Sequence, residues 1–219
     1  MRRSITASML CGLLCASVAS AQTSVSQENE ATTESGSRKI EFSLSAGLDV
    51  SKYSTKPSSS GLKNKLGFNF GVGVNVPVYY FHSDYGLHVQ TGLFLETKGA
   101  KEKYNGNKTS FSTTYLQIPV MAELKGEVAR NTSLFVDLGP YFAYGIGGNY
   151  DSDSSILPTG SLFTNILNRF DCGLISGVGV VYSKIKFGVW YETGFVNISN
   201  VEDYSFKTSN LMFSLSYIF

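Results

Sequence analysis

Apolar and polar residues alternate with a period of two in eight separate segments of this chain. The segments are 40–50, 66–80, 87–95, 116–124, 134–146, 170–182, 187–195 and 211–219. A period of two places successive side chains on opposite faces of an extended strand. Each segment is about ten residues long or longer, the length with which a tilted strand crosses a bilayer, whereas strands of globular proteins average about five or six residues. The pattern predicts eight membrane-crossing strands.

The connections between these segments alternate in length. Residues 82–86, 126–132 and 183–185 are short, whereas 53–65, 98–111, 147–168 and 199–208 are long, polar and rich in Ser, Gly, Asn and Lys. Outer-membrane barrels have short periplasmic turns and longer external loops, and an even strand number leaves both chain ends in the periplasm. We therefore predict an all-β fold, an eight-stranded antiparallel up-and-down transmembrane β-barrel over residues 39–219.

A soluble eight-stranded barrel of the lipocalin type also alternates, and the polar face separates the two alternatives. In a soluble barrel that face meets water and carries long polar side chains. Here it is mostly small, at Gly67, Asn69, Gly71, Gly73, Asn75, Gly173, Gly177, Gly179, Gly188 and Gly194. Small residues suit the narrow lumen of eight strands. Aromatic residues at strand ends, as in an interfacial girdle, also favour the membrane barrel; they are Tyr80, Phe81, Tyr182, Phe187, Tyr217 and Phe219.

Strand parity predicts which polar residues enter the lumen. They are Glu41, Asp49, His88, Gln90, Glu96, Lys98, Glu123, Lys125, Asp137, Arg169, Asp171, Lys186 and Glu192. Buried charges require pairing and hydrogen bonds, so we predict a packed polar network rather than an open channel. Trp190 has the same parity and is expected to fill the core. Pro119 and Pro140 interrupt their strands, which implies a bulge or a break at each.

The N-terminus has the features of an export signal. Arg2 and Arg3 precede an apolar run of about twelve residues, and Ala19-Ser20-Ala21 forms a small-x-small cleavage site. We predict a signal peptide at 1–21, a flexible periplasmic spacer at 22–38 and location in the outer membrane. Cleavage removes two of the three cysteines, so Cys172 is left without an intramolecular disulfide partner. The mature chain is nearly neutral, which gives no reason to expect nucleic-acid binding.

The residue types that carry chemistry are scattered. His82, His88 and Cys172 form no ligand cluster of the kind that metals need. The turn residues His82, Ser83 and Asp84 are consecutive and cannot easily orient one another for nucleophilic catalysis. The glycine pattern at 71–76 is not followed by a helix, as a dinucleotide site requires. We predict no catalytic residue, no cofactor, no metal and no enzymatic activity.

Several short motifs resemble a known family. Residues 210–219 (NLMFSLSYIF) end in Phe219 and resemble the C-terminal signal that outer-membrane barrels present to their insertion machinery. Residues 115–120 (YLQIPV), 139–141 (GPY), 171–179 (DCGLISGVG) and 191–194 (YETG) resemble the PorT-type outer-membrane barrels of Bacteroidota. The resemblance covers roughly 40–219 and implies an eight-stranded barrel with OmpA- or OmpX-like architecture. The family's named member assists export of proteins to the cell surface, and most relatives have no assigned activity.

The external loops are the remaining place for recognition. Residues 98–108 are basic, residues 148–155 are acidic, and Leu162 and Phe163 form an apolar pair that we expect to be exposed, as a partner contact or a lid. We predict a structural or interaction role, with outer-membrane lipids, the insertion machinery and an envelope or surface protein as partners. The alternatives are a secretion accessory, a narrow solute path and an outer-membrane lipid-modifying enzyme.

Overall fold

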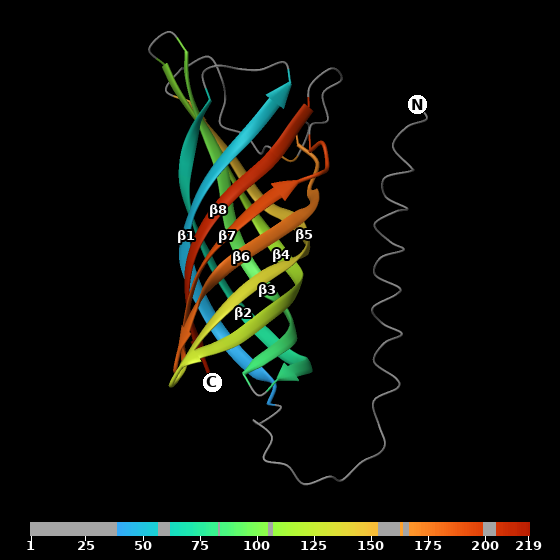
Figure 1. Cartoon of the computed structure of the whole chain (residues 1–219). Coiled ribbons are helices and arrows are strands. Elements are labelled where there is room, and N and C mark those ends of the chain that lie inside the picture. Colours follow the sequence, from blue (N-terminus) through green and yellow to red (C-terminus); the bar gives the residue numbers. More distant parts are fainter. Residues whose placement is uncertain are drawn as a thin grey trace, which may run out of the picture. The chain divides into compact units, whose positions relative to one another are not determined.

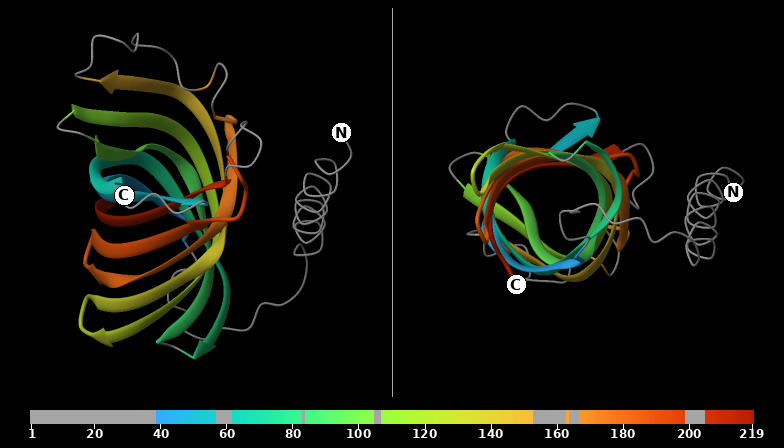
Figure 2. Two further views of the ribbon diagram at one scale, coloured as in Figure 1. Left: turned by 90° about the horizontal axis from the view of Figure 1, so that it is seen from above. Right: turned by 60° about the horizontal axis from the view of Figure 1, so that its bottom comes forward.

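The computed structural model describes residues 39–56, 62–82, 84–104, 107–152, 163, 167–198 and 205–219. Their eight strands are β1 (Glu41–Lys56), β2 (Leu62–His82), β3 (Tyr85–Tyr104), β4 (Asn107–Ala129), β5 (Thr132–Ser152), β6 (Phe170–Tyr182), β7 (Ile185–Gly194) and β8 (Ser205–Ile218). Each strand pairs antiparallel with the next, and β1 pairs with β8, which closes the barrel (Figures 1 and 2). The predicted fold is confirmed. The described residues include no helix long and apolar enough to span a membrane.

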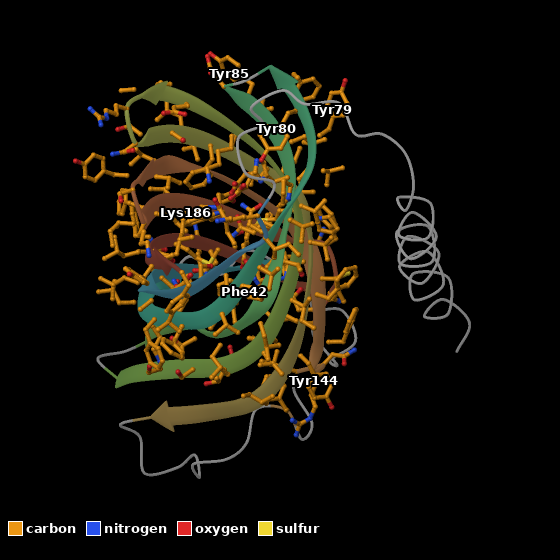
Figure 3. The ribbon with its side chains drawn as sticks, turned by 90° about the horizontal axis from the view of Figure 1, so that it is seen from below. Phe42, Tyr79, Tyr80, Tyr85, Tyr144 and Lys186 are labelled. Atoms are coloured by element: carbon orange, nitrogen blue, oxygen red, sulfur yellow. The ribbon has the colours of Figure 1, made fainter. Side chains whose placement is uncertain are left out.

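Both chain ends of the barrel lie at one end, which we call the inner end; the other is the outer end (Figure 1). Alternate side chains face outward, and most of these outward positions are apolar and exposed, from Phe42 on β1 to Phe219 after β8. Aromatic side chains gather at the inner end, where Tyr79, Tyr80 and Tyr85 lie together on β2 and β3 (Figure 3). The small and charged positions face the lumen, as the parity argument predicted.

The strands are longer at the outer end than the sequence predicted. Residues 98–104 and 107–111, expected to belong to a loop, are paired strand residues, with Lys103 opposite Lys108 and Tyr104 opposite Asn107. Likewise β5 continues to Ser152, β1 to Lys56, and β8 begins at Ser205. The loop predictions were wrong here because polar composition was taken as a loop signal. A strand beyond the apolar belt keeps its backbone hydrogen bonds to its neighbours, so it needs no apolar face.

The barrel wall is uneven at the outer end. Pairing between β5 and β6 ends at Tyr144 and Phe170, although β5 continues to pair with β4 as far as Ser152. We call residues 99–104 of β3, 107–112 of β4 and 147–152 of β5 the outer extension. Within the described ranges, residues 147–152 of β5 pair with β4 alone. Among the described residues, the backbone groups along this edge of the outer extension have no strand partner.

Pro119 and Pro140 lie where the strand ladders are interrupted. The β4–β5 ladder keeps its register from Pro119 to Ala122 but lacks the pair that would include Pro140. The β3–β4 ladder likewise lacks the pair that would include Pro119, and the hydroxyl of Thr91 donates to the Pro119 carbonyl at 2.8 Å. Of the two predicted outcomes, a break is confirmed at both prolines, since neither produces a register shift.

Glycines on β6 and β7 make room for aromatic side chains in the lumen. Trp190 and Phe135 lie with ring centres 5.7 Å apart. A Cβ atom on Gly177 would collide with the Trp190 ring, and one on Gly188 would collide with both rings. The glycines predicted to face the lumen are therefore required by close packing.

Replacing Gly177 with valine is expected to lower the free energy of unfolding by about 2 kcal/mol or more, because the new side chain overlaps the Trp190 indole. Gly147→Val is the matched control, since a Cβ there meets only Thr114, at 4.0 Å. Urea unfolding in lipid vesicles measures both variants. Equal stability of the two would contradict the packing argument.

Candidate functional site

The inner half of the lumen holds a cluster around Lys186 of β7. The Lys186 ammonium pairs with Glu123, lies 3.8 Å from Asp137 Oδ2 and donates to Gln90 Oε1 at 2.6 Å. Its Nζ also lies 3.9 Å from the centre of the Phe135 ring. Four strands thus converge on one buried ammonium group, which lies among the side chains inside the ring of strands (Figure 3).

The carboxylates of this inner cluster have further partners. Glu123 Oε1 accepts from Asn75 Nδ2 at 2.6 Å, and Asp137 Oδ2 accepts from the indole of Trp190 at 2.9 Å. Trp190, expected as a core filler, therefore also donates a hydrogen bond. Buried charges paired and hydrogen-bonded in this way hold strands in fixed register.

A second cluster surrounds Lys98 of β3 in the outer half. Lys98 Nζ lies 2.9 Å from Glu192 Oε2, 3.5 Å from Glu96 Oε2 and 3.3 Å from Gln117 Oε1. The amide of Gln117 donates to both carboxylates, to Glu96 at 2.8 Å and to Glu192. The ammonium also lies 4.7 Å from the centre of the Tyr141 ring. All these side chains are almost fully buried.

Two more carboxylates lie in the outer half. Asp171 Oδ2 accepts from the hydroxyls of Thr208 at 2.8 Å and Tyr141 at 3.2 Å. Asp49 Oδ1 accepts from Asn69, whose own carbonyl accepts from Ser214 at 2.8 Å. These bonds connect β1, β2, β5, β6 and β8 across the lumen. The predicted packed polar network is present in the described residues.

A small cavity separates the two clusters. It has about 40 Å³ of space for the centres of water molecules, which is room for roughly three waters. Gln90 and Trp190 line it beside the inner cluster, and Glu96 and Gln117 line it beside the outer cluster. The cavity is too small for an organic substrate, because ligand pockets measure about 300 Å³ or more.

A cluster of apolar residues, which we call the plug, lies toward the outer end of the lumen. Phe163, Leu167 and Ile198 are buried, and the Phe163 ring lies edge-on to Tyr115 with centres 5.9 Å apart. The guanidinium of Arg169 lies 5.2 Å from the centre of the Phe163 ring. The prediction that Phe163 is exposed was wrong, because Gly145 leaves space into which the ring inserts. The alternative role as a lid fits its position, and Leu162 lies outside the described residues.

A looser set of contacts lies at the inner mouth. Lys125 pairs with Glu41 at 3.1 Å, and both side chains remain partly exposed. His88 is buried, and its ring lies against Tyr80 with centres 5.8 Å apart. Every charged or polar residue that parity placed in the lumen is buried or half-buried there. Among the described residues, buried side chains occupy the lumen on both sides of the small cavity.

The residues considered for chemistry form no reactive group. Cys172 lies at an outward-facing position and is half-buried, and Asp84 lies exposed in a turn. Ser83 and the side chain of His82 lie outside the described part of the chain. Within that part, no three His, Cys, Asp or Glu side chains are arranged to hold a metal ion.

Sequence reasoning missed the apolar part of the lumen. Its large side chains are Tyr115, Met121, Phe135, Tyr141, Ile175 and Met212, all buried. Each has the inward parity of its strand, so the signal was present, but the parity argument was applied only to polar residues, glycines and Trp190. The lumen is a mixed core, in which apolar residues pack between two charged clusters.

Comparisons with solved structures find several distant likenesses, among them the following three. Ail of Yersinia pestis, in complex with the heparin analogue sucrose octasulfate, is 19% identical with a TM-score of 0.40, over 83% of this chain and 99% of that chain. Neisserial surface protein A is 11% identical with a TM-score of 0.44, over 81% and 97%. The outer membrane enzyme PagL is 11% identical with a TM-score of 0.45, over 81% and 98%. These likenesses are too distant to carry functional inference.

Among curated proteins no match is found. The family described as outer membrane protein beta-barrel domain matches residues 21–200, which is most of the chain. The match agrees with the closed eight-stranded barrel and with its continuous apolar outer surface. The protein is therefore located in the outer membrane, and the chain belongs to the outer membrane protein beta-barrel domain family.

Proposed function

We propose that this protein is a non-enzymatic surface-display barrel that recognises a protein partner through its outer extension. The observation that carries the proposal is the unpaired edge of β5 at 147–152, within the described ranges. An unpaired strand edge offers backbone donors and acceptors to an added strand of another chain. The outer extension lies at the external end when both barrel termini face the periplasm.

The filled lumen supports a role in recognition rather than transport. Two charged clusters and the Phe163 plug lie in series along the barrel. In planar bilayers the purified barrel is expected to give no stable single-channel conductance, because eight strands leave room only for side chains and the cavity between the two charged clusters measures only about 40 Å³. A porin added to the same bilayer serves as the positive control. A stable, large conductance from the barrel itself would overturn the closed-lumen argument.

Site-specific photocrosslinking in intact cells tests the recognition role. A photoreactive residue replaces Asn149, on the unpaired β5 edge, and a matched one replaces Leu138 within the apolar belt of the same strand. A discrete protein adduct at position 149 that is absent at 138 supports the proposal.

A trimmed variant completes this test. An Asn-Gly turn replaces residues 101–110 and joins Ala100 to Phe111, which pair directly in the wild type. The trimmed barrel is folded if its gel mobility still changes on boiling. Loss of the adduct in such a folded barrel supports recognition by the outer extension. The proposal would be refuted if both positions gave lipid adducts alone and if the trimmed variant restored the deletion strain as completely as the wild type does.

A role as an accessory to protein export is the second candidate, and the PorT-like motifs favour it. In the structure their residues build the lumen: Gln117 bonds to Glu192, and Tyr141 bonds to Asp171. Similar packing of the lumen in this chain and in PorT-type barrels would explain the motifs even if the two had different activities. Comparison of surface and secreted proteins between a deletion strain and its parent decides the matter. Accumulation of exported proteins in the periplasm supports the export role, and unchanged export excludes it.

We also propose that residues 1–21 are removed on export and that 22–38 form a periplasmic spacer. Mass spectrometry of the mature protein from outer membranes tests this. A mature chain that begins at Gln22 supports the proposal, and retention of Arg2 and Arg3 contradicts it.

Recognition by the insertion machinery is proposed to depend on Phe219. Its side chain is exposed beyond β8, and its backbone N–H donates to the Phe42 carbonyl at 2.9 Å. Deletion of Phe219 is expected to reduce the folded barrel in outer membranes severalfold, while refolding of the purified chain in detergent changes little. The band of folded protein on a gel run without boiling measures the folded barrel in outer membranes and the refolded barrel in detergent. Undiminished assembly in cells would contradict this role.

A further inference from the structure

The outer half of the lumen contains more buried carboxylates than cations. Asp49, Glu96, Asp171 and Glu192 are each at most 2% exposed, and Lys98 is the ammonium group that lies among them. Arg169 lies farther out and donates to the Gly145 carbonyl at 2.9 Å. Lys65 of β2, half-buried and directly opposite Ser51, donates to Ser110 at 3.0 Å. Four carboxylates against these two ammonium groups leave surplus negative charge away from water, which is unfavourable unless a proton or a further cation balances it.

Two polar side chains beside these carboxylates have no partner among the described residues. Asn210 of β8 is 1% exposed, and neither atom of its amide makes a hydrogen bond. Ser51 of β1 is 2% exposed, and its hydroxyl makes none. One oxygen of Asp49, Oδ2, is also unpartnered. Buried polar groups of this kind are rare and call for an explanation.

The strand register brings these groups together. Asn210 lies directly opposite Ser51 on β1 and directly opposite Glu192 on β7. Asp49 lies two residues from Ser51 on the same inward face and directly opposite Met212, which is two residues from Asn210 on β8. Side chains directly opposite or diagonal on one face of a sheet lie about 5–8 Å apart at Cβ, a spacing that one bound ion can bridge.

We propose that Asp49, Ser51 and Asn210 bind a Ca²⁺ ion in the outer lumen, with Glu192 adding negative charge beside it. Carboxylate, amide and hydroxyl oxygens are the ligands that Ca²⁺ prefers. Lys98 does not fill this role, because its ammonium already contacts Glu192, Glu96 and Gln117. Lys65 donates to Ser110 and not to the Ser51 hydroxyl. Water alone would satisfy the hydrogen bonds but carries no charge to set against the carboxylates.

Terbium luminescence tests the site in the whole mature chain. Tb³⁺ replaces Ca²⁺ at oxygen sites and emits when nearby tyrosines are excited; Tyr141 and Tyr115 lie within 5.5 Å of Lys98 Nζ, measured to their ring centres. Protein refolded in detergent after removal of metal ions is titrated with Tb³⁺ and then with Ca²⁺. A saturable signal that Ca²⁺ displaces is expected, with one Ca²⁺ per chain by elemental analysis.

Two variants and one control locate the ion. Asp49→Asn and Ser51→Ala are each expected to weaken Tb³⁺ binding about tenfold or more, because they remove a charge or a ligand oxygen. Asp137→Asn removes a carboxylate from the inner cluster and is expected to leave Tb³⁺ affinity unchanged. Without metal ions, Ser51→Ala is expected to be as stable as wild type, because its hydroxyl has no hydrogen bond among the described residues.

Ca²⁺ is further expected to raise the urea midpoint of the wild type more than that of Ser51→Ala. This comparison keeps the proposal testable if Asp49→Asn fails to fold. Equal Tb³⁺ affinity in wild type, Asp49→Asn and Ser51→Ala would overturn the proposal. So would the absence of Ca²⁺ from wild-type protein refolded in its presence.

Discussion

Lys98→Met is expected to lower the free energy of unfolding by about 3–5 kcal/mol. Removing the ammonium leaves Glu96 and Glu192 buried, adjacent and without a counter-charge, and uncompensated buried charges cost this much. Methionine fills similar volume, so the loss reports charge more than packing. Urea unfolding in lipid vesicles, followed by the fluorescence of Trp190, the single tryptophan, measures the change in buffer free of Ca²⁺.

Lys125→Met is the matched control for Lys98→Met. Its partner Glu41 is 31% exposed and Lys125 itself is 16% exposed, so water screens the pair. Pairs of this kind contribute about 1 kcal/mol or less. Equal losses of unfolding free energy in the two variants would contradict this expectation. The network around Lys98 would then contribute no more to stability than the exposed pair does.

Leu138→Arg is expected to destabilise the folded barrel by about 2–4 kcal/mol in a bilayer. Leu138 faces outward from the middle of β5 and is 53% exposed, so the guanidinium would lie in the hydrocarbon region. The same unfolding measurement in vesicles applies. In detergent the cost is expected to be smaller, because a micelle admits water more readily than a bilayer does.

Val128→Arg provides the comparison for Leu138→Arg. Val128 is also exposed, but it lies next to the inner end of β4, where the headgroups begin. Arginine near the interface costs about 1 kcal/mol or less. An equal cost at both positions would show that the apolar belt does not extend across the middle of the barrel as described.

Strand number, closure and the facing of side chains could be predicted because they follow from a local pattern. An alternation of two over ten residues assigns each side chain to one face without knowledge of the neighbouring strands. Gly177 and Lys186 were thus placed in the lumen from sequence, and the structure confirms both. The same rule, applied to apolar residues, would have found Phe135 and Met121.

Strand ends and lumen partners could not be predicted because they depend on contacts between distant residues. The strand extension at 98–104 and 107–111 is polar, and it depends on pairing between strands rather than on an apolar face. Gln117 bonds to Glu192, 75 residues away, and nothing local to either residue indicates the other. The plug residue Phe163 was misplaced for the same reason, since its site is made by Gly145 and Tyr115.

The pairing of β1 with β8 determines the order in which the chain can mature. Ser45 of β1 bonds to Ser216 of β8 across 171 residues, so the first strand to leave the ribosome waits for the last before its edge is covered. During that interval both terminal strands can pair with a wrong partner, and long-range pairing of this kind forms slowly. A chain with this seam therefore keeps two open strand edges until its C-terminus arrives at the membrane.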